Sequence, residues 1–266
     1  MRTIEVITNA LVNKGYKATA TTNRKNNVEM PCIKVDFDGY GIMIYPDKDI
    51  ENIENGTVSL DDVVKAIERT IHESNSCPEV SVLEDADYVK AHTRLAIEGN
   101  FSADYIKEPL ADYDGLSKYM ICPIHTPTGD GFARITNGLV KMLGLDVNDL
   151  WQSALENTIH ESTITHISDM IPVPVSSDLP MWVVTTKDFF KGASAILNKT
   201  MLESLAHEIG EKKLVIIPSS IHECIVIPYS QFDELQMIAG FIKEVNATQL
   251  EPQDILGDKP LLFNVA

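Results

Sequence analysis

Residues 214–227 have the sequence LVIIPSSIHECIVI, in which two apolar runs flank a polar connector. The runs Leu214–Ile217 and Cys224–Ile227 have the length and the β-branched content of buried strands. The connector between them, residues 218–223, contains proline and two serines, which are typical of turns. The stretch therefore predicts two strands joined in a hairpin.

A second hairpin is predicted near the N-terminus. Apolar residues at 32–37 and 42–45 flank Asp38-Gly39, a dipeptide that accepts the positive φ of a tight turn, so the hairpin spans residues 32–45. Amphipathic helices are interspersed: they are predicted over 4–14, 60–72, 85–97, 137–143 and from 147 onward. Because hairpins outnumber strand–helix–strand units, the sequence predicts an α+β fold, with mixed or antiparallel hairpin-rich sheets packed against amphipathic helices.

The segment 99–115 has no clear period, and we place the main boundary of the chain there. This gives an N-terminal α+β region, 1–117, and a C-terminal α+β region, 118–266, and leaves open whether the two form one continuous unit. The acidic segment 47–56 is predicted as a solvated loop, and 261–265 as an edge strand. The small residues of 191–195 are predicted to permit close packing.

The composition bears on partners and compartment. The chain has 39 acidic and 22 basic side chains, a net charge of −17, so we expect neither direct nucleic-acid binding nor attraction to anionic membranes. The charge is spread evenly, with 21 acids and 12 bases in residues 1–117 and 18 and 10 in residues 118–266. No apolar run is long enough to span a bilayer. Four cysteines far apart in the sequence favour buried thiols and a cytoplasmic location.

Four phrases in the second half of the chain carry a family resemblance: ITNGLVKMLGLDVNDLWQSALENT, MWVVTTKDFFKGASAIL, LVIIPSSIHECIVIP and EVNATQLEPQDIL. In this order and spacing they resemble a bacterial family of uncharacterised proteins, domain of unknown function 5688. A more distant similarity, to the domain of unknown function 1444 group, covers the same stretch. The strong part spans Tyr119 to Leu256. The resemblance implies an intracellular bacterial protein, associated with the mobile or accessory part of a genome, and it implies no reaction, cofactor or catalytic residue.

The best local candidates for catalysis lie in the connector 218–224. Ser219 and Ser220 supply hydroxyls, His222 an imidazole and Glu223 a carboxylate, which are the groups that a hydrolytic nucleophile, its base and an orienting acid require. No Gly-x-Ser-x-Gly elbow holds either serine. The alternative is a structural turn, in which the serines bond the backbone and His222 packs at the strand entry. The turn is favoured.

Histidines offer little for a metal site. Four of them precede a glutamate (His72, His160, His207 and His222), but none has a second histidine at the spacing by which a helix binds zinc. His160 and His166 share a face only in a strand. Neither PTGDGFARITNG nor KGASA matches a phosphate-binding loop. We therefore expect no metal and no cofactor.

The sequence thus favours a non-catalytic binding or interaction protein whose partner is an unknown protein or small molecule. One alternative is a hydrolase that uses the 218–224 connector. Another is an acidic inhibitor that mimics nucleic acid, which requires the negative charge to gather on one face.

Overall fold

The chain folds into two compact units. The computed structural model describes residues 2–26, 28–37, 41–75, 78–126, 129–170, 180–218, 220–231 and 235–265. Unit 1 comprises Met1–Val80 with Thr126–Gly129, and unit 2 comprises Ser81–His125 with Asp130–Ala266. This division lies upstream of the 117/118 boundary expected from sequence. The strand pairing explains why, since residues 94–99 pair with residues 116–121 and so tie the middle of the chain to the C-terminal half.

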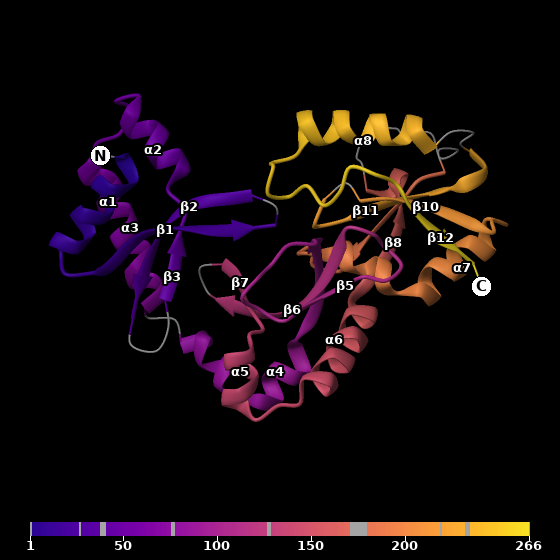
Figure 1. Cartoon of the computed structure of the whole chain (residues 1–266), viewed down its shortest axis with the longest axis horizontal. Helices are drawn as coiled ribbons and strands as arrows, with labels where there is room; N and C mark the ends of the chain where they lie inside the picture. Colours follow the sequence, from indigo (N-terminus) through magenta and orange to yellow (C-terminus); the bar gives the residue numbers. More distant parts are fainter. Residues whose placement is uncertain are drawn as a thin grey trace. The chain divides into compact units, whose positions relative to one another are not determined.

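Unit 1 packs helices on a small antiparallel sheet (Figure 1). Its elements are α1 (Thr3–Asn13), β1 (Lys17–Lys25), β2 (Val28–Asp36), β3 (Gly41–Ile44), α2 (Asp47–Glu54) and α3 (Leu60–Asn75), and the short helix η1 (Pro78–Glu84) follows. The strand order is β1-β2-β3. Ile33 and Val35 of β2 share an apolar core with Ile7 and Leu11 of α1 and with Ile67 of α3. The predicted helices over 4–14 and 60–72 are confirmed as α1 and α3.

The hairpin predicted over 32–45 is present as β2 and β3, which pair Ile33 with Ile44. Its Asp38-Gly39 turn lies outside the described residues. Two other segments differ from expectation. No strand was predicted over β1, whose polar, threonine-rich sequence is nevertheless suited to a half-buried strand. The segment predicted as an acidic loop forms α2, because its first-turn acids complement the helix dipole while Ile50 and Ile53 pack on the core.

The described residues of unit 2 form two sheets. The elements of its first half are α4 (Ala86–His92), β4 (Arg94–Gly99), β5 (Lys107–Pro109), β6 (Leu116–Thr126), β7 (Gly129–Arg134), α5 (Asn137–Leu143) and α6 (Val147–Glu161). Strand β6 pairs with β4, β5 and β7. The predicted helix starts of α5 and α6 are confirmed, since Thr136 and Asp146 accept hydrogen bonds from backbone N–H groups of the first turn.

One prediction in this half is wrong. The helix predicted over 85–97 begins correctly, because the Asp85 side chain caps the backbone N–H groups of Asp87 and Tyr88. It ends at His92, and Arg94–Gly99 forms strand β4 instead. All six residues of β4 are buried, so the strand has no alternation that would separate it from a helix by sequence.

The second half of unit 2 forms a sheet in the order β12-β10-β11-β9-β8. Its elements are β8 (Ser162–His166), η2 (Ile167–Asp169), β9 (Trp182–Thr186), η3 (Gly192–Leu197), α7 (Lys199–Glu208), β10 (Lys213–Ile217), β11 (Cys224–Pro228), η4 (Tyr229–Gln231), α8 (Leu235–Gln249) and β12 (Leu261–Asn264). The predicted hairpin of residues 214–227 is confirmed as β10 and β11, and β12 is the predicted edge strand. Helix α8 lies along one face of this sheet (Figure 1), with Ile238 and Ile242 packed on Val215 and Ile227.

A shared core joins the two sheets of unit 2. Ile97 of β4 and Leu116 of β6 pack with Val184 of β9, Leu214 of β10 and Val226 of β11. Helix α6 also binds β4 directly, since the backbone N–H of Leu95 donates to the Thr158 hydroxyl at 2.8 Å. Together with the antiparallel registers, these helices and sheets confirm the predicted α+β class. Among the helices of the described ranges, none combines the length and the apolarity that crossing a bilayer requires.

Candidate functional site

Among the described residues of the connector 218–224, the Ser220 hydroxyl and the His222 ring contact different partners. Ser220 is buried, and its Oγ accepts a hydrogen bond from the backbone N–H of His222 at 2.9 Å. Its own backbone N–H donates to Glu223 O at 3.4 Å. Glu223 is half-buried beside it, and Ser219 lies outside the described residues. The Ser220 hydroxyl is therefore used within the turn, as the structural alternative expects.

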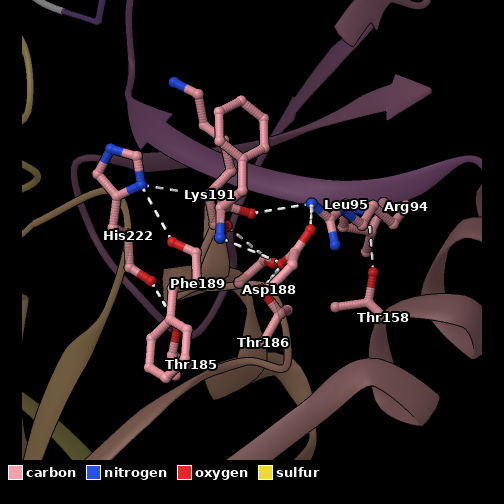
Figure 2. Close-up of polar contacts among 11 residues, drawn as sticks. Arg94, Leu95, Thr158, Thr185, Thr186, Asp188, Phe189, Lys191 and His222 are labelled. Atoms are coloured by element: carbon pink, nitrogen blue, oxygen red, sulfur yellow. Dashed lines mark hydrogen bonds and ion pairs between the residues drawn. The ribbon is translucent and has the colours of Figure 1, made fainter. Parts of the chain in front are cut away.

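The imidazole of His222 contacts a different part of the chain. Its Nδ1 lies 3.3 Å from the backbone nitrogen of Lys191 and 3.2 Å from Phe189 O. Its Nε2 lies 3.8 Å from Asp254 Oδ1, and its ring meets Phe190 edge to face. None of the contacts that the described residues give this ring comes from a serine. His222 thus supports the loop between β9 and η3 (Figure 2).

That loop, residues 187–191, has an unusual backbone. Phe189 and Lys191 have φ of +58° and +55°, a region that costs a residue with a side chain about 1–3 kcal/mol. The neighbouring Gly192 permits a close approach, because a Cβ there would lie 2.7 Å from His222 O and would overlap Thr185. The small residues of 191–195 therefore permit close packing, as predicted. The strained loop is held in place by these contacts.

Asp188 is the polar centre of the loop. Its Oδ1 accepts hydrogen bonds from the Thr186 hydroxyl at 2.8 Å and from the backbone N–H of Phe190 at 3.1 Å. Its Oδ2 lies 2.6 Å from Nη2 of Arg94, with which it forms an ion pair (Figure 2). Partial burial acts to raise the pKa of Asp188, but the bonds from Arg94 and Thr186 outweigh it and hold this pKa below its ordinary value.

Arg94 is the most informative side chain of the site. Only 7% of it is exposed, and its two hydrogen bonds to the described residues, to Asp188 Oδ2 and Phe190 O, both start at Nη2. A guanidinium has five N–H donors, so the N–H groups on Nε and Nη1 remain without a partner among the described residues. A buried donor without a partner costs about 1–3 kcal/mol, and more when it is charged. Such a group calls for a ligand or water.

A cleft of about 380 Å³ lies beside Arg94. Its polar lining consists of His92, Arg94, Asn157, His160, Glu161 and Asp188. Ala91 and Pro123 add a small apolar part. The volume is within the range of small-molecule sites in proteins. The cleft lies wholly within unit 2.

Two polar side chains of the lining, His92 and Asn157, are each held by a hydrogen bond to a backbone carbonyl. The Nδ1 of His92 lies 2.9 Å from Tyr88 O, and its ring stacks on Tyr88 with centroids 4.0 Å apart. Since a carbonyl only accepts, Nδ1 carries the proton, and in the neutral ring Nε2 is an acceptor. Asn157 donates from Nδ2 to Thr93 O at 2.8 Å, which leaves Oδ1 as its acceptor. The cleft thus combines one strong cationic donor with several acceptors.

The histidines considered for a metal are placed apart. His160 is the next-to-last residue of α6, and His166 ends β8, where its Nδ1 bonds Ser168. Within the described ranges, no three His, Cys, Asp or Glu side chains gather in a geometry that holds a metal ion. The lining of the cleft suits ligand binding through hydrogen bonds and charge.

Sequence reasoning missed both Arg94 and Asp188. They are brought together by the packing of β4 against the loop that follows β9, which no local pattern reveals. One signal was available: Arg94 stands at the start of a short run, RLAIEG, whose apolar residues predict burial. An arginine at such a position is rarely buried without a partner, so it marks a candidate site.

The sequence of the chain matches the model of one protein family. No curated protein and no solved structure matches the chain at a significant level. The model of the family of unknown function DUF5688 matches residues 2–264, which is nearly the whole chain and includes both units. The chain therefore belongs to the family of unknown function DUF5688.

Proposed function

We propose that this protein is a non-catalytic binding protein that holds the anionic group of a small molecule on Arg94, in the cleft of unit 2. The proposal follows the leading hypothesis from the sequence and gives it a location. The observation that carries it is a guanidinium that is more than nine-tenths buried, lines a cleft and has donors on Nε and Nη1 without a described partner.

Burying the charge of Arg94 without satisfying all of its donors is costly. Asp188 neutralises Arg94, but it bonds only Nη2, so most of the directional bonding capacity of the guanidinium is unused. A carboxylate or phosphate on the remaining donors forms charge-assisted hydrogen bonds in a partly dry site, where such bonds are strong. The strained loop fixes Asp188, so Arg94 is positioned before any ligand arrives.

The alternatives receive less support. The hydrolase alternative needs a serine hydroxyl near the His222 ring, whereas the described contacts of Ser220 are to the backbone. The acidic-inhibitor alternative stays a prediction from the net charge. We also propose a cytoplasmic location in a bacterium. Its support is that the described cysteines, Cys32, Cys122 and Cys224, are buried free thiols, and burial raises the pKa of Cys122 to about 11.

Isothermal titration calorimetry tests the proposal. The probes are sodium pentanoate and inorganic phosphate, titrated into the full chain and into Arg94→Gln. We expect at least one probe to bind, and Arg94→Gln to weaken that binding by about tenfold or more, because charged hydrogen bonds are lost.

The matched control is Lys199→Gln. Lys199 is an exposed base of unit 2 that pairs with Asp112 in a different cleft, at 2.7 Å. Its variant should bind the probes as the unchanged chain does. The proposal fails if no carboxylate- or phosphate-bearing probe binds at millimolar concentration, or if Arg94→Gln and Lys199→Gln change binding equally.

A further inference from the structure

The cleft that contains Arg94 is also lined by a carboxylate, Glu161, which could bind a second group of the ligand. Glu161 ends α6 and lines the cleft with about a third of its side chain exposed. Its Oε1 lies 3.5 Å from Lys187 Nζ and 3.8 Å from His160 Nε2. Both distances exceed the 2.7–2.9 Å typical of a charged hydrogen bond, so its carboxylate is only loosely paired.

The two carboxylates of the cleft differ in this respect. Asp188 accepts three hydrogen bonds, from Arg94, Thr186 and the backbone of Phe190, and has little capacity left. Glu161 has most of its lone pairs available to a donor on a ligand. The acceptor atoms His92 Nε2 and Asn157 Oδ1 belong to the same lining. One cationic donor and three acceptor groups therefore surround one small volume.

From this charge pattern we infer that the ligand is a small zwitterion, with a carboxylate that binds Arg94 and a protonated amine that binds Glu161. Its chemical class is that of amino acids and other amino-carboxylates. The inference rests on the proposed function, since it requires the anion site at Arg94. An ammonium group has three donors, which match the carboxylate, the imidazole nitrogen and the amide oxygen.

Complementarity explains why a simple anion is the weaker fit. A carboxylate or phosphate alone brings negative charge beside Glu161 and Asp188, which repel it. An amine on the same molecule converts the repulsion from Glu161 into attraction. A cleft of about 380 Å³ accommodates a five-carbon chain, and Ala91 and Pro123 provide apolar contact for its methylene groups.

Calorimetry with matched probes tests the inference. The zwitterions are 2-aminopentanoate and 5-aminopentanoate, which place the amine next to the carboxylate or at the far end. Pentanoate lacks the amine, pentylamine lacks the carboxylate, and inorganic phosphate is an anion of another shape. We expect at least one zwitterion to bind about tenfold more tightly than pentanoate, pentylamine and phosphate, since one added charged hydrogen bond has that effect.

Variants separate this inference from the proposed function. Glu161→Gln should remove the advantage of the zwitterion while leaving pentanoate binding equal or slightly tighter. The control is Glu156→Gln, on the same helix, where the carboxylate bonds Gln152 at the surface; it should preserve the advantage.

Three results would overturn the inference. They are equal binding of pentanoate and both zwitterions, tightest binding of phosphate, and an advantage that persists in Glu161→Gln. If Arg94→Gln still weakens pentanoate in these cases, the anion site stands and only the zwitterion is excluded. If no probe binds, the proposed function fails as well.

Discussion

Two buried cations, Arg94 and Lys107, lie at opposite ends of strand β4 and differ in how many of their donors have partners. Arg94 begins β4, and Lys107, at the start of β5, reaches the other end of that strand. The ammonium of Lys107 donates to Glu98 Oε1 at 2.9 Å and to Gly99 O at 2.7 Å, and it lies 3.5 Å from the ring centre of Phe101. Glu98 is buried and also accepts from the Tyr105 hydroxyl.

Lys107 forms a structural ion pair, whereas Arg94 belongs to the proposed ligand site. Lys107 and Arg94 have almost the same exposure, 8% and 7%. The ammonium of Lys107 has three donors, forms two hydrogen bonds and lies over the Phe101 ring, whereas the neighbours of Arg94 bond only one of its three nitrogens. Burial of a charge is therefore a weak indicator of function, and unpaired donors on a side chain that lines a cleft are a stronger one.

The largest expected effect comes from breaking the satisfied pair. Glu98→Ala leaves Lys107 charged and buried, so it should lower the free energy of unfolding of unit 2 by about 3–5 kcal/mol. Urea unfolding followed by tryptophan fluorescence measures this, because Trp151 and Trp182 both belong to unit 2.

The control for this change is Glu108→Ala, which removes a partly exposed pair with Lys118. It should cost about 0–1 kcal/mol. Equal losses in the two variants would show that the pair between Glu98 and Lys107 is not the stabilising contact that the comparison assumes.

The next effect concerns the loop that brings Asp188 to Arg94. Gly192→Ala places a Cβ against His222 O and Thr185, and this overpacking should destabilise unit 2 by about 1–3 kcal/mol. The control Gly138→Ala has only an ordinary contact, 3.6 Å from Thr136, and should be neutral or stabilising within helix α5. The same unfolding measurement compares them, and a neutral Gly192→Ala would contradict the close approach.

A smaller effect is expected when Arg94 itself is removed. Arg94→Gln deletes two hydrogen bonds but also deletes donors that had no partner, and Asp188 is 44% exposed and can be hydrated. The loss in unfolding free energy should be about 1 kcal/mol, well below that of Glu98→Ala. A loss as large as that of Glu98→Ala would mean that Arg94 serves stability, as Lys107 does, and would weaken the proposed site.

The smallest effect is a pH dependence at Asp188. The pKa of Asp188 in the folded chain is below its ordinary value of about 3.9. The ionised side chain therefore contributes to the free energy of unfolding above that value, and this contribution is lost as the pH falls through the lower pKa of the folded chain. The difference in unfolding free energy between the unchanged chain and Asp188→Asn should be constant from pH 7 to about pH 5 and should shrink below the ordinary carboxyl pKa. Urea unfolding at each pH measures it, and a difference that grows on acidification would contradict the assigned direction.

Much of the fold was predictable because its signals are local. Thr136 and Gly144 bound α5, and Asp146 caps α6, each through hydrogen bonds or a positive φ that the residue type itself favours. Strand β4 was not predictable in this way, since its identity depends on being covered on both faces by other parts of unit 2. Strand β1 was missed because its polar, half-buried sequence gives a weak signal.

The site was less predictable than the fold. Ser220 and His222 drew attention because they are close in sequence, yet their contacts go to backbone atoms. Arg94 and Asp188 form an ion pair across 94 residues, and the unpaired donors of Arg94 become visible only once every neighbour is in place. A satisfied lysine and an unsatisfied arginine cannot be distinguished from the chain alone.

The hydrogen bond between Leu95 and Thr158 has a consequence for association. Among the described strands, β4 pairs only with β6, and an open strand edge is a template on which other chains can add and aggregate. At this edge the backbone N–H of Leu95 donates a hydrogen bond to the Thr158 hydroxyl, and the carbonyl of the adjacent Thr93 accepts one from the Asn157 side chain. Helix α6 therefore covers this edge of β4, so that another chain can add a strand along β4 only after α6 has moved away.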